Sequence, residues 1–139
     1  MKKLLMIAAV LLLAVACNKN QKAVKTLDGN WNATAFSATD GATTVDYIAF
    51  GFTVQMNFDG CKLKDDEYCN MTTTFTFDGD TETETSVYRV INDGEKLEQK
   101  ENLAATTSET IDISELTKTT LKLIIVDGET TTNITLEKI

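Results

Sequence analysis

The chain has 139 residues, of which 42% are hydrophobic and 24% are charged, and it contains neither proline nor histidine. A chain of this length is typical of a single domain, since domains usually have about 100–200 residues. The missing histidine excludes Ser-His-Asp and Cys-His catalytic sites, histidine metal ligands and histidine-ligated haem. The formal net charge of −8 argues against nucleic-acid binding, which depends on basic residues that neutralise phosphates. We therefore expect a protein that is not an enzyme and that carries neither a cofactor nor a metal ion.

The first seventeen residues have the pattern of an export signal. Two lysines precede an unbroken apolar run over residues 4–13, and small residues follow it. This run is too short to cross a bilayer, which needs about 20 apolar residues, so we expect a cleaved signal peptide over residues 1–16. The segment Ala14–Cys17 resembles the lipobox of bacterial lipoproteins, in which the cysteine is lipidated and becomes the first residue of the mature chain. An ordinary secretory signal cleaved after Ala16 is the alternative.

The resemblance to lipoproteins implies where the protein is attached. Cys17 would carry about two or three acyl chains, palmitate among them, because a single chain binds a membrane only marginally. Asn18 is not the aspartate that retains many Gram-negative lipoproteins on the inner membrane, so we expect the outer membrane, with the domain facing the periplasm. Residues 17–26 are polar and unpatterned, and we expect the lipidated cysteine and a flexible tether there. Loss of the two signal lysines takes the formal charge from −8 to −10.

The mature chain is rich in threonine, and β-branched residues favour strands. Alternating apolar and polar residues predict eight strands, over residues 29–37, 50–58, 71–77, 83–91, 95–101, 107–113, 119–126 and 130–138. No amphipathic helix is predicted. Asp-Gly turns between successive strands indicate an all-β, antiparallel up-and-down meander over residues 27–139. Eight such strands close, or nearly close, into a barrel that is wide enough for side chains or for one small ligand.

Two cysteines remain in the predicted domain, Cys61 and Cys69, and they flank the loop between two predicted strands. In an exported protein such a pair indicates a disulfide bond. On the chain-entropy model this bond would stabilise the fold by about 2–3 kcal/mol. A redox pair or a metal site would need CxxC spacing or further ligands.

Residues 78–84 form an acidic segment that resembles a cation site in one respect. Carboxylates stand there at alternate positions through a glycine-containing turn, namely Asp78, Asp80, Glu82 and Glu84. Oxygen ligands at alternate positions can hold Ca²⁺. The pattern lacks the glycine and the final glutamate of an EF-hand loop. We therefore favour an exposed acidic turn without a metal ion.

The segment Gly29–Trp31 stands at the start of the first predicted strand and resembles the Gly-X-Trp signature of the lipocalins and the wider calycin group. The resemblance covers residues 26–139 and implies that Trp31 packs across the closed end of a barrel, with a large mouth loop over residues 39–47. Lipocalins place an arginine over this tryptophan, and here Lys138 is the nearest substitute. The second lipocalin motif is missing, so the chain is lipocalin-like. The alternative is that Trp31 is a core residue of another β-sandwich.

Two functions fit this interpretation. The first is a lipid-anchored binding module whose barrel holds a small apolar ligand, with a lining drawn from Phe50, Phe52, Met56, Phe75 and Tyr88. The same side chains could instead fill a solid core. The second is a structural or interaction protein, such as an envelope assembly factor or an inhibitor of an exported enzyme, whose partner contacts the loop 61–69. A cavity of about 300 Å³ or more would favour the first function, and a filled barrel with an exposed aromatic or loop patch would favour the second.

Overall fold

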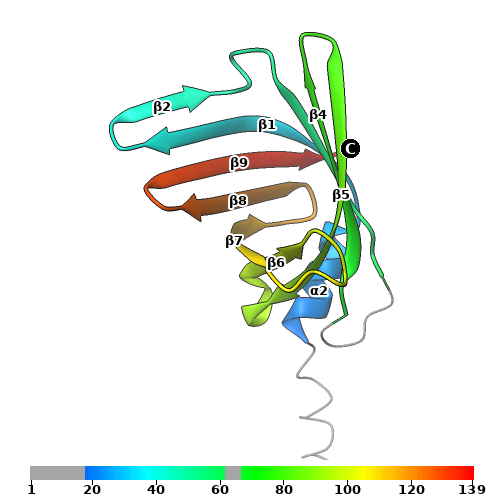
Figure 1. Cartoon of the computed structure of the whole chain (residues 1–139). Helices are drawn as coiled ribbons and strands as arrows, with labels where there is room; N and C mark the ends of the chain where they lie inside the picture. The colour runs from blue at the N-terminus through cyan, green and yellow to red at the C-terminus, as the bar shows by residue number, and fades with distance from the viewer. Residues whose placement is uncertain (1–17, 62–66) are drawn as a thin grey trace, which may run out of the picture.

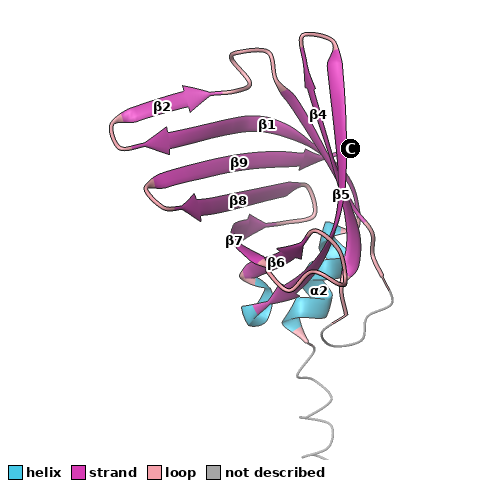
Figure 2. Ribbon diagram, in the orientation of Figure 1, coloured by secondary structure: helices cyan, strands magenta, loops and turns pink. Residues whose placement is uncertain are grey.

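The computed structural model describes residues 18–61 and 67–139, which form nine strands, one α-helix and one 3-10 helix (Figures 1 and 2). The signal peptide and Cys17 lie outside these residues. In chain order the elements are α2 (Lys19–Leu27), β1 (Gly29–Asp40), β2 (Thr43–Asp46), β3 (Thr53–Phe58), β4 (Cys69–Phe77), β5 (Asp80–Ile91), η1 (Asn92–Gly94), β6 (Lys96–Lys100), β7 (Glu109–Leu116), β8 (Thr120–Asp127) and β9 (Thr130–Lys138).

The strands form one antiparallel meander that closes on itself. Eight strands follow one another around the ring in the order β1-β3-β4-β5-β6-β7-β8-β9, and β9 pairs back with β1 over most of the length of both strands. The short strand β2 pairs only with the far end of β1, from Ser37 to Asp40. The predicted all-β meander and its barrel are therefore confirmed, and closure gives every strand of the ring two neighbours, although β5 extends beyond its pairing with β6 from Asp80 to Ser86.

The prediction of a large loop over residues 39–47 is wrong. Strand β1 continues to Asp40, turns at Gly41 and returns as β2. The β-branched residues of this hairpin pair across it, and the Thr39 and Thr44 hydroxyls are 2.9 Å apart. The chain leaves the sheet only after β2, at residues 47–51. Gly51 in this segment has a φ of +92°, which a strand cannot accommodate. The predicted strand 50–58 therefore begins at Thr53.

The flexible tether predicted over residues 17–26 is also wrong, because Lys19–Leu27 forms helix α2. The Asn18 side chain caps this helix by accepting a hydrogen bond from the backbone N–H of Asn20 at 3.1 Å. Three apolar residues lie on one side of α2 and are buried against the barrel, Ala23, Val24 and Leu27. So few apolar residues among lysines give a weak helical pattern, and the helix depends on its packing against the barrel.

Helix α2 covers one end of the barrel, which we call the closed end (Figure 1). Trp31 is 0% exposed there, and its indole N–H donates to the Leu27 carbonyl at 2.7 Å. The Lys138 ammonium lies 5.1 Å from the centre of the Trp31 ring and donates to the Thr26 carbonyl at 2.9 Å. Trp31 is thus buried at the closed end, as the Gly-X-Trp resemblance implies, and Lys138 is the cation that lies over its ring.

Gly29 belongs to the same arrangement. It has a φ of +117°, and a Cβ atom built on it would lie 3.1 Å from the Lys138 side chain. A side chain at this position would therefore be strained and would push Lys138 from its position over Trp31. This contact explains why glycine is needed two residues before Trp31 in this chain.

The half of the barrel next to the closed end is filled with side chains. Tyr88 is 0% exposed, packs edge-on against Phe58 with ring centres 5.2 Å apart, and donates from its hydroxyl to the Asp59 carbonyl at 2.9 Å. Burial raises the pKa of Tyr88, and the nearby carboxylates of Asp28 and Asp59 raise it further. The other fully buried residues of this core include Leu27, Met71, Leu97, Leu121, Leu123 and Leu136.

We predict that Trp31→Ala lowers the free energy of unfolding by about 3–5 kcal/mol, through lost apolar burial and the void that it leaves. Trp31→Phe should cost less, because phenylalanine retains most of the volume. Urea denaturation of the three proteins tests this prediction. Trp31 is the only tryptophan, so the folded wild-type protein should also show blue-shifted emission. An unchanged denaturation midpoint for Trp31→Ala would contradict a core position.

The raised pKa of Tyr88 predicts that the free energy of unfolding falls at alkaline pH. Above pH 10, the ordinary tyrosine pKa, the unfolded chain loses the Tyr88 proton while the folded chain retains it. The contribution of Tyr88 is therefore complete below pH 10 and declines as the pH rises toward the raised pKa of the folded state. We expect Tyr88→Phe to cost about 1 kcal/mol at neutral pH, through the lost hydrogen bond, and to reduce the loss of stability above pH 10. Equal alkaline slopes for both proteins in urea denaturation would refute this assignment.

Candidate ligand site at the open end of the barrel

The end of the barrel opposite α2 is open. Four connections between strands border it, at residues 41–42, 47–52, 78–79 and 128–129. The fifth connection, residues 101–108, lies lower in the wall and nearer to α2, because the short strand β6 ends at Lys100, which pairs with Val87 (Figure 1). Inward-facing side chains near this end are only half-buried, whereas those in the half of the barrel next to the closed end are buried. Phe75, which pairs with the buried Val54, and Ile125, which follows the buried Leu123 on β8, are two of them. The barrel therefore has a solid closed half and an open upper half.

A hollow of about 610 Å³ lies where β5, β6 and β7 meet the 101–108 loop. This volume exceeds the roughly 300 Å³ that small-ligand sites usually need. Its lining is polar and comprises Glu84, Thr85, Ser86, Gln99, Lys100, Glu101, Thr107, Ser108 and Glu109.

Strand pairing explains which of these side chains share the hollow. Glu84, Ser86 and Tyr88 alternate along β5, so they share one face, and Tyr88 is in the core. Gln99 pairs with Tyr88 on one side and with Glu109 on the other. Residues directly opposite in neighbouring strands face the same way, so this set faces the barrel interior.

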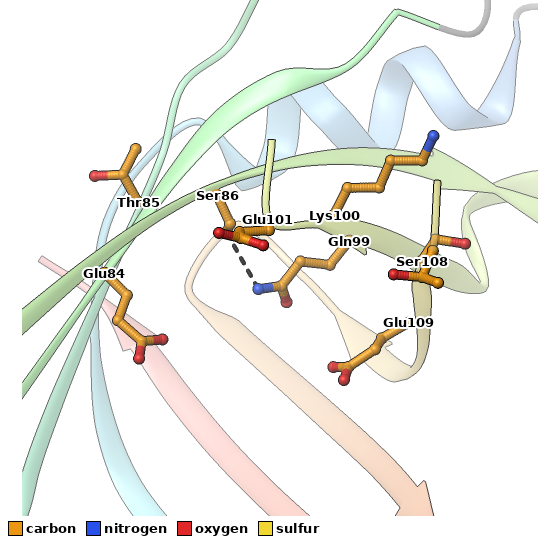
Figure 3. A pocket seen from close by; sticks show the side chains of 9 residues that line it. Glu84, Thr85, Ser86, Gln99, Lys100, Glu101, Ser108 and Glu109 are labelled. Atoms are coloured by element: carbon orange, nitrogen blue, oxygen red, sulfur yellow. Dashed lines mark hydrogen bonds between the residues drawn. The ribbon is translucent and has the colours of Figure 1, made fainter. Parts of the chain in front are cut away.

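The centre of the hollow has a hydrogen-bonded pair flanked by carboxylates (Figure 3). The Gln99 amide donates to the Ser86 hydroxyl at 3.1 Å, and Glu84 and Glu109 lie on either side of Gln99. The Lys100 side chain turns away from them, and its ammonium lies 5.0 Å from the centre of the Tyr68 ring. The hollow therefore presents a negative charge to solvent.

Glu98 lies on the outer face of the barrel and fixes the 101–108 loop beside the hollow. Its carboxylate accepts hydrogen bonds from Arg89 and, at 2.9 Å, from the hydroxyl of Ser108 at the end of the 101–108 loop. The hydrogen bond from Arg89 is the main reason why the pKa of Glu98 lies below its ordinary value, and the one from Ser108 adds to it. These contacts tie the loop to β6.

An aromatic row lines the adjoining part of the open end. We use this name for Phe36, Tyr47, Phe52 and Phe77, whose rings contact one another in that order. The centres of successive rings are 4.5, 5.5 and 4.2 Å apart. The row crosses from β1 through the 47–52 segment to β4, and β5 with its carboxylates is the next strand of the ring. The open end thus has an aromatic arc beside an acidic arc.

The structure separates the residues that the sequence suggested as a ligand lining. Phe52 and Phe75 lie near the open end and are half-buried. Met56 and Tyr88 belong to the filled core. Phe50 is 67% exposed and lies on the turn before β3. The polar lining was missed, although continuing the alternation of Tyr88 back along its strand would have placed Ser86 and Glu84 on the inner face.

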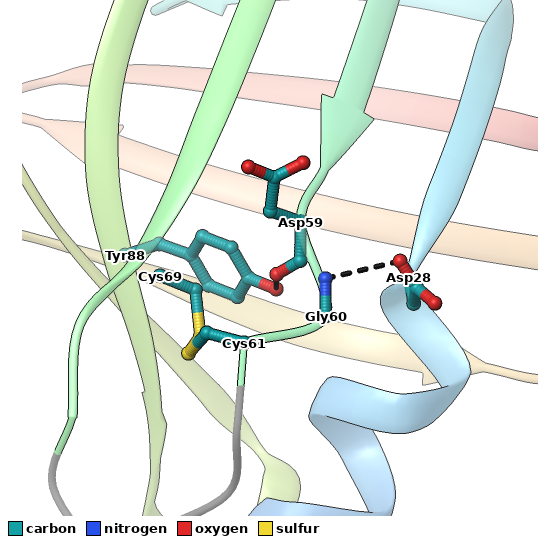
Figure 4. Close-up of a disulfide and its surroundings, with 6 residues drawn as sticks. All are labelled: Asp28, Asp59, Gly60, Cys61, Cys69 and Tyr88. Atoms are coloured by element: carbon teal, nitrogen blue, oxygen red, sulfur yellow. Dashed lines mark hydrogen bonds between the residues drawn. A yellow bond between two sulfur atoms is a disulfide. The ribbon is translucent and has the colours of Figure 1, made fainter.

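The predicted disulfide between Cys61 and Cys69 is confirmed, with Cα atoms 5.3 Å apart (Figure 4). Cys69 is buried beside Tyr88, with which it pairs across β4 and β5. Asp28 accepts a hydrogen bond from the backbone N–H of Gly60 at 3.0 Å. The bond therefore joins the segment that follows β3 to the start of β4 at the closed end.

In residues 18–61 and 67–139, no three acidic or cysteine side chains are grouped so that they could hold a metal ion, and the carboxylates of residues 78–84 are exposed along the β4–β5 hairpin. No helix in this part of the chain has the length and apolar character needed to cross a membrane.

Comparison with known proteins supports the fold. No protein-family model matches the chain, and no curated protein matches it. Among solved structures, the chain is similar to a redesigned β-barrel, with 12% sequence identity and a TM-score of 0.51. The match covers 84% of this chain and 95% of the other. With the ring of paired strands, this likeness shows a closed antiparallel β-barrel, an architecture that fits a lipocalin-like protein.

Proposed function

We propose that this chain is a lipid-anchored binding module of the bacterial envelope, related to the calycins, and that its open end binds a small amphipathic cation. The hollow of about 610 Å³ beside the aromatic row carries this proposal. The hollow supplies carboxylates from Glu84, Glu101 and Glu109. The aromatic row supplies an apolar surface in the next part of the same opening.

The polarity of the hollow changes the ligand class expected from the sequence. A wholly apolar molecule seated there would cover the Ser86 and Gln99 side chains and the carboxylates without replacing their contacts with water. Each polar group left without a partner costs about 1–3 kcal/mol, and charged groups cost more. A molecule with an ammonium group avoids this cost, because the carboxylates can accept its hydrogen bonds. Its apolar part would then contact Phe52, Phe75 and Phe77.

The attachment to a membrane rests on the sequence. The Ala14–Cys17 lipobox pattern supports acylation of Cys17, and Asn18 supports the outer membrane with the barrel in the periplasm. The anchor would keep the binding module at the envelope, where it meets small molecules that enter the periplasm.

The ligand class can be tested with three molecules that share one tail: octylammonium, octanol and octanoate. We predict that calorimetric titration shows octylammonium binding about tenfold more tightly than octanol, a difference of about 1.4 kcal/mol. Octanoate should bind more weakly than octanol, because the carboxylates repel it. Replacing the two flanking carboxylates in Glu84→Gln/Glu109→Gln should remove most of the preference for the amine.

The matched control is Asp127→Asn/Glu129→Gln, which removes the same charge from the β8–β9 turn, outside the lining of the hollow. We expect this control to retain the preference for octylammonium. A wild-type protein that binds octanol and octylammonium equally would refute the cation site. Equal losses in both variants would attribute the preference to net charge rather than to the hollow.

The anchor has its own test. Cys17→Ser should abolish incorporation of labelled palmitate and release the protein from membranes, because serine cannot accept the thioether-linked lipid. Undiminished labelling of the Cys17→Ser protein would contradict lipidation at this residue.

A second function is favoured by one observation. Phe50 is 67% exposed and Phe77 is 46% exposed, and both border the open end. Exposed aromatic residues on a rigid scaffold are typical of protein interfaces. If the open end binds a partner protein, Phe50→Ser should weaken that complex and leave the octylammonium titration unchanged.

A further inference from the structure

We infer that the barrel stands on the membrane with its closed end and α2 against the lipid headgroups, and with the open end directed away from the bilayer. The inference rests on the proposed acylation of Cys17. It concerns a different surface from the ligand site, and it replaces the loose attachment that a flexible tether would give.

The first step is the short connection between Cys17 and α2. The helix begins at Lys19, so Asn18 alone separates it from the acylated residue. Consecutive Cα atoms are about 3.8 Å apart, which places Cys17 within roughly 8 Å of Lys19 whatever its conformation. The start of α2 must therefore lie close to the membrane surface.

The second step is that α2 cannot swing away from the barrel. Val24 and Leu27 are buried in the main core. The Asn20 side chain accepts a hydrogen bond from the backbone N–H of Gly94 at 2.8 Å, which ties the start of the helix to η1. At the other end of the helix, the Leu27 carbonyl accepts the Trp31 indole N–H at 2.7 Å. With both of its ends fixed, α2 transmits the position of the anchor to the whole barrel.

The third step is the charge on the outer face of α2. Lys22 and Lys25 are exposed, and at 3.6 residues per turn they project on the side opposite to the buried apolar residues. Lys19 is also 69% exposed, in an ion pair with Asp93 at 3.7 Å. Lysines close to an anionic membrane surface are attracted to it. The exposed ion pair with Asp93 is weak and does not remove Lys19 from this face.

The fourth step is the uneven distribution of charge along the barrel. At the closed end, acidic residues such as Asp28, Asp59 and Asp93 are accompanied by lysines on α2 and near the ends of β7 and β9. Among the described residues at the open end and around the hollow, Lys100 is accompanied by ten acidic residues: Asp40, Asp46, Asp78, Asp80, Glu82, Glu84, Glu101, Glu109, Asp127 and Glu129. An anionic bilayer therefore repels the open end and admits the closed end.

The anchor, the fixed helix and the charge distribution favour the same orientation. Figure 1 shows α2 at one end of the barrel, while the β1–β2, β4–β5 and β8–β9 turns point away from it. In this orientation the ligand site opens to the aqueous compartment, and its ligand arrives from solution rather than from the lipid phase.

Magnetic resonance of the acylated mature protein, which begins at Cys17, tests the placement. The protein would be labelled with ¹⁵N, purified from membranes and placed in nanodiscs of phosphatidylethanolamine and phosphatidylglycerol with a gadolinium-chelating headgroup lipid. The two ends of the barrel are separated by the length of its strands, and β1 alone has 12 residues at about 3.3 Å each. Paramagnetic broadening falls steeply with distance, so the two ends should differ in it. We expect amides of α2 and residues 117–119 to broaden at least about tenfold more than those of turns 41–42 and 128–129.

Charge-reversal variants separate the role of the lysines from that of the anchor. Lys22→Glu/Lys25→Glu should reduce the contrast between the two ends at least about twofold, because the helix face is then repelled by the headgroups. The control Lys100→Glu/Lys122→Glu changes the net charge equally on other surfaces and should retain the contrast. An unchanged contrast in the helix variant would overturn the lysine contact.

The mass of the N-terminal peptide from the same sample distinguishes two failures. An acylated Cys17 with equal broadening at both ends would overturn the orientation and leave the anchor standing. An unacylated Cys17 would overturn the anchor and, with it, the orientation.

Discussion

The indole of Trp31 joins three parts of the chain that are distant in sequence. It donates a hydrogen bond to the last residue of α2 and lies under the Lys138 ammonium from the end of β9, while its own strand begins the barrel. Lys138 in turn donates to the carbonyl of Thr26. The closing pair of strands and the covering helix are thus fixed by one buried ring. Because this end is closed and filled, the other end of the barrel can remain open without loss of the fold.

The strands were predictable because alternation along the sequence directly reports the two faces of a sheet. The disulfide and the position of Trp31 followed in the same way from local motifs. Helix α2 was not predictable, because Ala23, Val24 and Leu27 are too few to mark a helix until a barrel is present to bury them. The hollow was missed for a related reason. Glu84 and Glu109 are 25 residues apart in sequence, and only the pairing of β5, β6 and β7 brings them to one face.

The division of the barrel into two halves relates stability to the proposed function. The closed half contains the buried aromatic and aliphatic residues and the disulfide, so it supplies most of the apolar burial on which stability depends. The open half contains the acidic hollow and the aromatic row, whose side chains remain half-buried or exposed. Carboxylates that repel one another reduce stability. Their position beside an apolar surface is therefore better explained by a ligand that carries both a positive charge and an apolar group.

Native mass spectrometry of the protein purified from the envelope tests the cation site most directly. The spectrum should contain the acylated chain together with a complex of higher mass, and the released molecule should be an amine with an apolar portion. Substitution of Glu84 and Glu109 by glutamine should remove that complex while the acylated chain persists. The proposal would be contradicted by a spectrum with the acylated chain alone, recorded under conditions that preserve an added octylammonium complex. A released molecule that is neutral or anionic would contradict it equally.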